Sequence, residues 1–306
     1  MSFEDSCAPV FAGHQTFHPR FGWLKKGVDA FRENPRIFAE SDATVQLGVG
    51  KNMVEAIKFW CQAFKLIENR EGQLRVAEFA ERIFGKQGVD PYLEDVSTLW
   101  LLHLRLLADR CQAPVWWLFF NEFGHATFSQ KRLADSIAVE VADSVLDKKP
   151  NRSSLDKDVD ALIRMYTLKS KKARQSIEDV LDSPFRDLGI VIPNDVAEGS
   201  FRLVFGRKPN LNGFVVQYAC LQFMRDKALS ASTISLNRLV SDEGSPGKTL
   251  KLDVETLKTY LEEFDLEGVQ VSSAAGSLQM SISKSADILL EEAFNAYYLK
   301  GGSIES

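Results

Sequence analysis

The segment 11–27, FAGHQTFHPRFGWLKKG, gathers side chains that could act on a phosphate group. It holds two histidines, three phenylalanines, one arginine, one tryptophan and two lysines, and it contains no acidic residue. Guanidinium and ammonium groups bind phosphate oxygens, and imidazole transfers protons near neutral pH. We therefore expect Arg20 to hold a phosphate, His14 to transfer a proton, and Lys25 and Lys26 to contact nucleic acid.

Packing offers an alternative explanation of the same segment. Phe17, Phe21 and Trp23 would then dock it into the core, and His14 would satisfy a buried carbonyl group. The sequence leaves both interpretations open.

A second candidate site is an acidic cluster at 90–95, which consists of Asp90, Glu94 and Asp95. Mg²⁺ or Mn²⁺ prefers a few carboxylates together with water and phosphate oxygens, as in phosphodiester cleavage. We therefore expect these three residues to be metal ligands and catalytic groups. The alternative is that they stabilise the start of the following helix through its dipole.

These groups must be positioned by helices, and one stretch predicts a helix-turn-helix. Residues 41–50 indicate a short helix that ends at Gly48, and apolar residues recur at helical spacing through 51–67. A turn at 69–72 stands where a winged variant has its hairpin. The expected DNA contacts are the polar residues on the outer side of this unit, Lys51, Asn52, Lys58 and Arg70. The alternative is a helix pair that packs without touching DNA.

The end of the chain predicts a second winged-helix-like unit. Residues 233–264 indicate helix, loop and capped helix, and VQVSS and LQMSI around AAGS predict a β-hairpin. Acidic residues crowd the helix that would enter DNA, so here we favour contacts with protein over contacts with DNA.

Two domains are expected, 1–150 and 151–306, because residues 147–154 combine charge, proline and serine as linkers do. All histidines and tryptophans lie within the first 125 residues, which places any chemistry in the first domain. The predicted fold class is mainly α, multi-domain, with helix-turn-helix or winged-helix-like units and short β-hairpins.

Composition limits the class of protein further. A net charge of −5 argues against a protein that coats nucleic acid indiscriminately, since phosphate binding depends on many cations. The four scattered cysteines form no C-x-x-C pair, and the first residues lack the pattern of a secretory signal. No apolar stretch approaches the roughly 20 residues of a membrane span. We expect reduced thiols and a cytoplasmic protein that does not contact the membrane.

Four blocks of the chain resemble, in order, the signature blocks of one bacterial family: FAGHQTFHPRFGWLKKG, LGVGKNMVEAIKFW, DPYLEDVSTLWLLH and WWLFFNEF. The chain is similar to the SspB-like family of bacterial DNA phosphorothioation (Ssp) systems, a domain-of-unknown-function family. The resemblance implies DNA nicking in the service of backbone sulfur modification and phage defence.

The leading expectation is therefore a nickase that hydrolyses one strand of double-stranded DNA with Mg²⁺ or Mn²⁺. Its partners would be DNA and other phosphorothioation-system proteins, and a homodimer is left open. The alternative is a non-catalytic DNA-binding adaptor or regulator that recruits sulfur-transfer partners.

Overall fold

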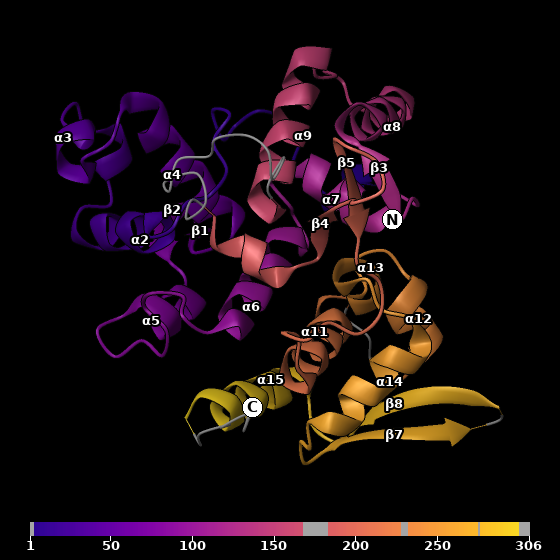
Figure 1. Ribbon diagram of the computed structural model, residues 1–306. Helices are drawn as coiled ribbons and strands as arrows, with labels where there is room; N and C mark the ends of the chain where they lie inside the picture. Colours follow the sequence, from indigo (N-terminus) through magenta and orange to yellow (C-terminus); the bar gives the residue numbers. More distant parts are fainter. Residues whose placement is uncertain (1–2, 168–182, 228–231, 275, 300–306) are drawn as a thin grey trace. The chain divides into compact units, whose positions relative to one another are not determined.

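The computed structural model describes residues 3–167, 183–227, 232–274 and 276–299 (Figure 1). The chain forms two compact units, Met1–Val204 (unit 1) and Phe205–Ser306 (unit 2). This division lies later in the chain than the expected boundary at 150. Helices α8 (Gln130–Asp143) and α9 (Arg152–Tyr166) flank residue 150 and pack against each other inside unit 1. The fold is mainly α-helical, as predicted.

Unit 1 begins with short helices and a hairpin, among them the two helices that the spacing in 41–67 predicted. These are α1 (Phe3–Ser6), α2 (Trp23–Glu33), the 3₁₀ helix η1 (Ile37–Ala39), α3 (Ala43–Leu47), α4 (Lys51–Ala63), β1 (Ile67–Arg70), β2 (Gln73–Val76) and α5 (Glu78–Phe84). Gly48 ends α3 with a left-handed backbone (φ 62°), a conformation that costs glycine little. Strands β1 and β2 pair antiparallel, from Ile67 opposite Val76 to Arg70 opposite Gln73. Helix, turn, helix and hairpin thus follow in the expected order.

The core of unit 1 is built around α6 (Val96–Leu107) and α7 (Pro114–Asn121). Every residue of α7 is buried, and so is nearly every residue of α6, as their apolar sequences predicted. Polar groups in this core find partners: the Nδ1 of His103 lies 2.8 Å from the hydroxyl of Tyr166 on α9. An isolated backbone β-bridge between Cys7 and Cys111, whose thiols are free, joins the N-terminal segment to the loop before α7.

A small antiparallel sheet completes unit 1. Its strands are β3 (Thr127–Ser129), β5 (Ser200–Leu203) and β4 (Val191–Pro193), in that spatial order. The 3₁₀ helix η2 (Pro184–Leu188) packs against α6 and α9. It precedes β4.

Unit 2 contains a three-stranded antiparallel sheet in the order β6-β8-β7. Its elements are α11 (Gly213–Asp226), β6 (Thr233–Ser235), α12 (Leu236–Ser241), α13 (Pro246–Leu250), α14 (Val254–Glu263), β7 (Val269–Ala274), β8 (Ser277–Ile282) and α15 (Ala286–Tyr298). The hairpin and the capped helix are found where predicted: Asp253 caps α14 by accepting from the Thr256 N–H at 2.8 Å. Residues 233–235, expected as helix, form strand β6 instead, because they pair with β8.

Helices α11 and α14 approach closely at Gly213. A Cβ at that position would lie 2.5 Å from the Tyr260 carbonyl oxygen, so the contact requires glycine. Among the helices that the structure describes, none combines the length and apolarity needed to cross a bilayer.

Candidate nucleic-acid interface

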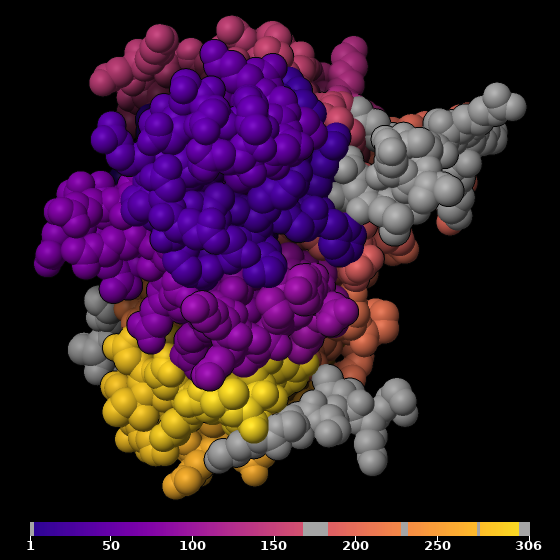
Figure 2. Space-filling model, turned by 90° about the vertical axis from the view of Figure 1, so that its left-hand side faces the viewer, coloured from indigo at the N-terminus to yellow at the C-terminus, as the bar shows by residue number. Residues whose placement is uncertain are grey.

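A pocket of about 690 Å³ in unit 1 brings together three segments singled out in the sequence. Its walls come from residues 21–22, the face of α2 that carries Lys25, Lys26 and Asp29, the end of α3, and residues 91–93 of the acidic loop. Figure 2 faces the side of unit 1 on which the N-terminal helices lie, drawn in indigo. Part of the arm, the helix-turn-helix and the acidic loop therefore converge, although only some of the predicted side chains line the pocket.

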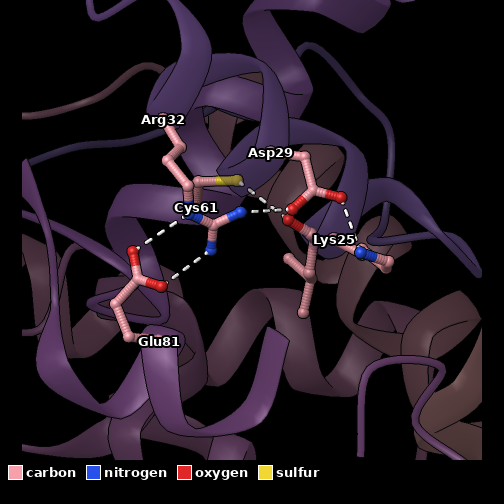
Figure 3. Close-up of polar contacts among 6 residues, drawn as sticks. Lys25, Asp29, Arg32, Cys61 and Glu81 are labelled. Atoms are coloured by element: carbon pink, nitrogen blue, oxygen red, sulfur yellow. Dashed lines mark hydrogen bonds and ion pairs between the residues drawn. The ribbon is translucent and has the colours of Figure 1, made fainter. Parts of the chain in front are cut away.

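Lys25 and Lys26, predicted to bind nucleic acid, both line this pocket. The Nζ of Lys25 lies 2.6 Å from Asp29 Oδ2, and Arg32 contacts the other oxygen of the same carboxylate at 2.6 Å (Figure 3). Arg32 also pairs with Glu81 at 3.0 Å, and this hydrogen bond raises the pKa of Arg32. Asp29 is thus held between two cations.

Lys26 has a neutral partner. Its Nζ donates to the Leu47 carbonyl at the end of α3, at 3.1 Å. No described carboxylate is paired with it. This contact places the start of α2 beside the turn that leads into α4.

Two aromatic side chains, Phe21 and Tyr92, lie exposed at the pocket. They are 45% and 70% exposed, respectively. Neither ring packs against another aromatic ring in the part of the chain that the structure describes. Exposure of Phe21 disagrees with the packing alternative, which placed this ring in the core, and Tyr92 was not singled out from the sequence.

The outer face of α4 carries the other predicted DNA contacts. Lys51 and Asn52 are exposed and Lys58 is half-buried, while Val54, Ile57 and neighbouring apolar residues face the core. Lys51 and Lys58 are two helical turns apart and so share one face. Arg70 is exposed on the hairpin, where its Nε lies 2.6 Å from Glu68 Oε1. These residues are accessible, as a DNA-contacting role requires.

His14 is buried, with 1% of its surface exposed. Its Nε2 lies 2.6 Å from Asp158 Oδ1 on α9, and the ring stacks on Trp60 at a centroid distance of 5.8 Å. The Ala12 N–H donates to the same carboxylate at 2.9 Å. An imidazole enclosed in this way lacks the access to a phosphodiester that proton transfer requires. We therefore reassign His14 from proton transfer to positioning, with a carboxylate in place of the expected carbonyl.

The arm that contains His14 is held at further points. Trp60 Nε1 donates to the Phe17 carbonyl at 3.0 Å, and Arg164 donates to the Thr16 carbonyl at 2.5 Å. Thr16 has a left-handed backbone (φ 71°), which these contacts maintain. Arg20 places its guanidinium 5.5 Å from the Trp23 ring, and its phosphate-holding role stays a prediction.

The acidic cluster caps backbone groups. Asp90 is buried, and its two carboxylate oxygens accept from the Glu94 N–H at 2.8 Å and the Asp95 N–H at 3.2 Å. Asp95 in turn caps α6 by accepting from the Ser97 N–H at 2.8 Å. No group of three or more His, Cys, Asp or Glu side chains in the described ranges is arranged to hold a metal ion.

The residues predicted to bind Mg²⁺ therefore do not fit it. Both oxygens of Asp90 and one oxygen of Asp95 accept hydrogen bonds from backbone N–H groups, and Glu94 is exposed beside them. We correct the assignment of these three residues as metal ligands, since Asp90 and Asp95 instead hold backbone N–H groups at and before the start of α6. Their role as catalytic groups stays a prediction.

Asp158, which holds the arm through His14 and the Ala12 N–H, was not singled out from the sequence. It follows Leu155 by three residues and precedes Val159 and Leu162, all of which are buried on α9. An acidic residue on the apolar face of an amphipathic helix requires a polar partner, and that pattern was the available signal.

The comparisons with known proteins place this fold. Residues 11–298 match the family model described as a protein of unknown function, DUF4007. The chain belongs to this family. It is also similar to a crystal structure of magnesium ion-bound SspB, with 31% identity and a TM-score of 0.88, and to a second SspB crystal structure, with 32% identity and a TM-score of 0.87. Each similarity covers 97% of this chain and 90% of the other.

No curated protein matches the sequence. The two structural similarities confirm the SspB-like relationship that the four sequence blocks indicated.

Proposed function

We propose that this protein binds double-stranded DNA and nicks one strand, within a phosphorothioation-linked modification or defence system. The observation that carries the proposal is the similarity to SspB, which extends over 97% of the chain. Similarity of this extent includes both units. It therefore supports a shared activity more strongly than a similarity confined to one DNA-binding module would.

In this proposal α3, α4 and the β1-β2 hairpin act as a winged helix-turn-helix. The exposed Lys51, Asn52 and Lys58 lie on the outer face of α4, and Arg70 lies on the hairpin. Lys26 adjoins the end of α3, so its charge adds to the same surface. Local cations allow such a protein to bind DNA despite its net negative charge.

A requirement for Mg²⁺ or Mn²⁺ is part of the proposal. One of the similar crystal structures is of magnesium ion-bound SspB. Because Asp90, Glu94 and Asp95 do not fit a metal, we assign no ligand to any of them.

The proposal is tested with supercoiled plasmid at low salt, with Mg²⁺, with Mn²⁺ and with chelator. Open circles should form only with metal. The Lys51→Ala/Lys58→Ala variant should lose both DNA retention and nicking, because it removes two phosphate-binding charges. A matched control is Lys86→Ala/Lys131→Ala, which removes two exposed lysines elsewhere in unit 1 and should behave as the parent protein. Supercoils that stay intact under all metals would reject nicking.

A second candidate function is a DNA-binding adaptor without catalysis. The observation that favours it is that three of the five residues predicted to be catalytic, His14, Asp90 and Asp95, have structural partners. Salt-dependent DNA retention without cleavage would select this function.

Unit 2 is the proposed contact for other proteins of the system. The exposed acidic side chains on and beside α14, among them Glu255, Glu262 and Glu263, would repel DNA phosphates. A partner with a basic surface fits this charge.

A further inference from the structure

We propose that the pocket between α2, α3 and residues 91–93 takes one nucleotide. Its base lies against Phe21 and Tyr92, and its phosphate lies beside Lys25 and Lys26. The inference rests on the proposed function insofar as that nucleotide comes from a bound DNA strand. A free nucleotide offers the same chemistry from a second source.

The pocket has the size and lining that a base requires. Its volume of about 690 Å³ lies within the usual range for small-ligand sites, roughly 300–1,000 Å³. Leu47, Phe84 and Leu93 form an apolar floor, and they are themselves buried. The pocket is also lined by polar side chains, among them Lys25, Lys26 and Gln46. The face of a base can therefore lie on the apolar floor while its polar edge meets these side chains.

The two exposed rings supply surfaces for stacking. Large apolar side chains exposed beside a pocket indicate a binding site more often than isolated ones do. Tyr92 precedes Leu93, which has a left-handed backbone (φ 57°) and a buried side chain. The loop thus accepts a strained conformation that buries Leu93 and leaves Tyr92 outside. Aromatic rings that face solvent in this way stack with bases of any sequence.

The start of α2 is suited to a phosphate. Gly22, its N-cap, lines the pocket and offers no side-chain cap, and the first turn contains no acidic residue. Lys25 and Lys26 lie in that first turn, where the positive end of the helix dipole disfavours cations. An anion at this position reverses the unfavourable interaction and can accept from N–H groups of the first turn other than that of Trp23, which already donates to the Arg20 carbonyl at 3.1 Å.

Nearby acids do not cancel this attraction. Asp29 is paired with both Lys25 and Arg32. Glu33 lies two turns further along α2, about 11 Å from the lysines by helical rise. Lys26, whose Nζ contacts the Leu47 carbonyl and no described carboxylate, therefore supplies the charge available to a phosphate at this end of the pocket.

The first experiment measures binding of deoxyadenosine 5′-monophosphate, deoxyadenosine and inorganic phosphate by calorimetry. The monophosphate should bind more tightly than either part alone. Tyr92→Ala should weaken it about tenfold, the loss of one stacked ring, and Tyr92→Phe should restore it. Lys25→Ala/Lys26→Ala should reduce the advantage of the monophosphate over the nucleoside. Phe205→Ala removes an exposed ring from unit 2 and is the matched control.

The second experiment distinguishes the two sources with a duplex that carries 2-aminopurine. An increase of its fluorescence on binding, abolished by Tyr92→Ala, supports a base taken from the DNA. Monophosphate binding without that increase supports a free nucleotide. No monophosphate binding, together with no effect of Tyr92→Ala in the duplex, overturns the inference, even where plasmid nicking succeeds. Failure of duplex binding alone rejects the proposed function and leaves the monophosphate result to decide the pocket.

Discussion

The His14–Asp158 contact joins two positions that are 144 residues apart in the chain. Asp158 accepts from the imidazole and from the Ala12 N–H, so one buried carboxylate satisfies two donors of the arm. Removal of such an acceptor leaves buried donors without partners, which costs more than the loss of an exposed ion pair.

We expect Asp158→Ala to lower the free energy of unfolding by about 3 kcal/mol, measured by urea denaturation. The control is Asp156, an exposed residue two positions before Asp158 on the same helix, which pairs with Arg152. Asp156→Ala should change stability by less than about 0.5 kcal/mol. Equal effects of the two substitutions would contradict the anchoring role of Asp158.

Cys7 and Cys111 form a second residue-scale pair. Burial raises the pKa of Cys7. At Cys111 burial opposes ionisation, but the hydrogen bond from Cys7 and the Lys65 charge outweigh it and lower the pKa of Cys111. A thiol with a lowered pKa next to a second thiol, on backbones joined by a β-bridge, suits disulfide formation.

Oxidised glutathione should therefore join Cys7 to Cys111, with release of two equivalents of reduced glutathione. Cys61 and Cys220 are buried, and burial raises the pKa of both, so they should stay reduced. Thiol titration and peptide mapping measure the outcome, with Cys7→Ser as the control. A glutathione adduct at Cys61 would contradict this prediction.

At the scale of elements, the segment before α11 contains a buried lysine. Lys208 is 2% exposed, and its Nζ donates to the Gly206 carbonyl at 2.8 Å. Burial lowers its pKa from the usual 10.5 to about 8, a shift that the nearby Asp253 opposes. The folded state thus binds this proton less tightly than the unfolded state does.

Stability of unit 2 should consequently rise with pH between about 8 and 10.5, the window in which the unfolded state holds the proton that the folded state has lost. Below pH 8 both states are protonated, and this gain is absent. Lys208→Met should remove the rise, as measured by the difference between the two unfolding curves at each pH. Parallel curves across this range would contradict the prediction.

Individual helices and turns were predictable from the sequence, but contacts between elements far apart in the chain were not. Gly48 between two helical patterns predicted the α3–α4 turn, and the apolar sequence of α6 predicted its burial. The pairing of residues 233–235 with β8 depends on a strand about 45 residues later, which local propensity does not register.

The candidate site shows the same distinction. Lys51 and Asn52 were predicted as accessible from helical spacing alone. The pocket required Phe21 and Lys25 of the segment 11–27 to converge with Tyr92 of the acidic loop, and no periodicity encodes such a convergence. Asp90 and Asp95 have the residue types of metal ligands, but their hydrogen bonds to backbone N–H groups become visible only in three dimensions.

At the scale of the whole molecule, a net charge of −5 confines the proposed DNA binding to a local surface. Five cations are assigned to that surface: Lys25, Lys26, Lys51, Lys58 and Arg70. The number of phosphates that they neutralise sets the salt dependence, because each contact releases condensed counterions.

The logarithm of the DNA-binding constant should fall with the logarithm of salt concentration with a slope of about −4 to −5. Lys51→Ala/Lys58→Ala should reduce the steepness by about 2, and Lys86→Ala/Lys131→Ala should leave it unchanged. Fluorescence anisotropy of a labelled duplex over a salt series measures both. An unchanged slope in the first variant would place the DNA elsewhere on the protein.

Helix α4 touches two environments at once. On its inner side, Trp60 stacks on His14 and donates a hydrogen bond to the Phe17 carbonyl. On its outer side, Lys51 and Lys58 face solvent. A ligand that tilts α4 from outside would shift the indole against the arm. The fluorescence of Trp60 should therefore change when a ligand binds the outer face of α4, although the indole itself does not reach that face.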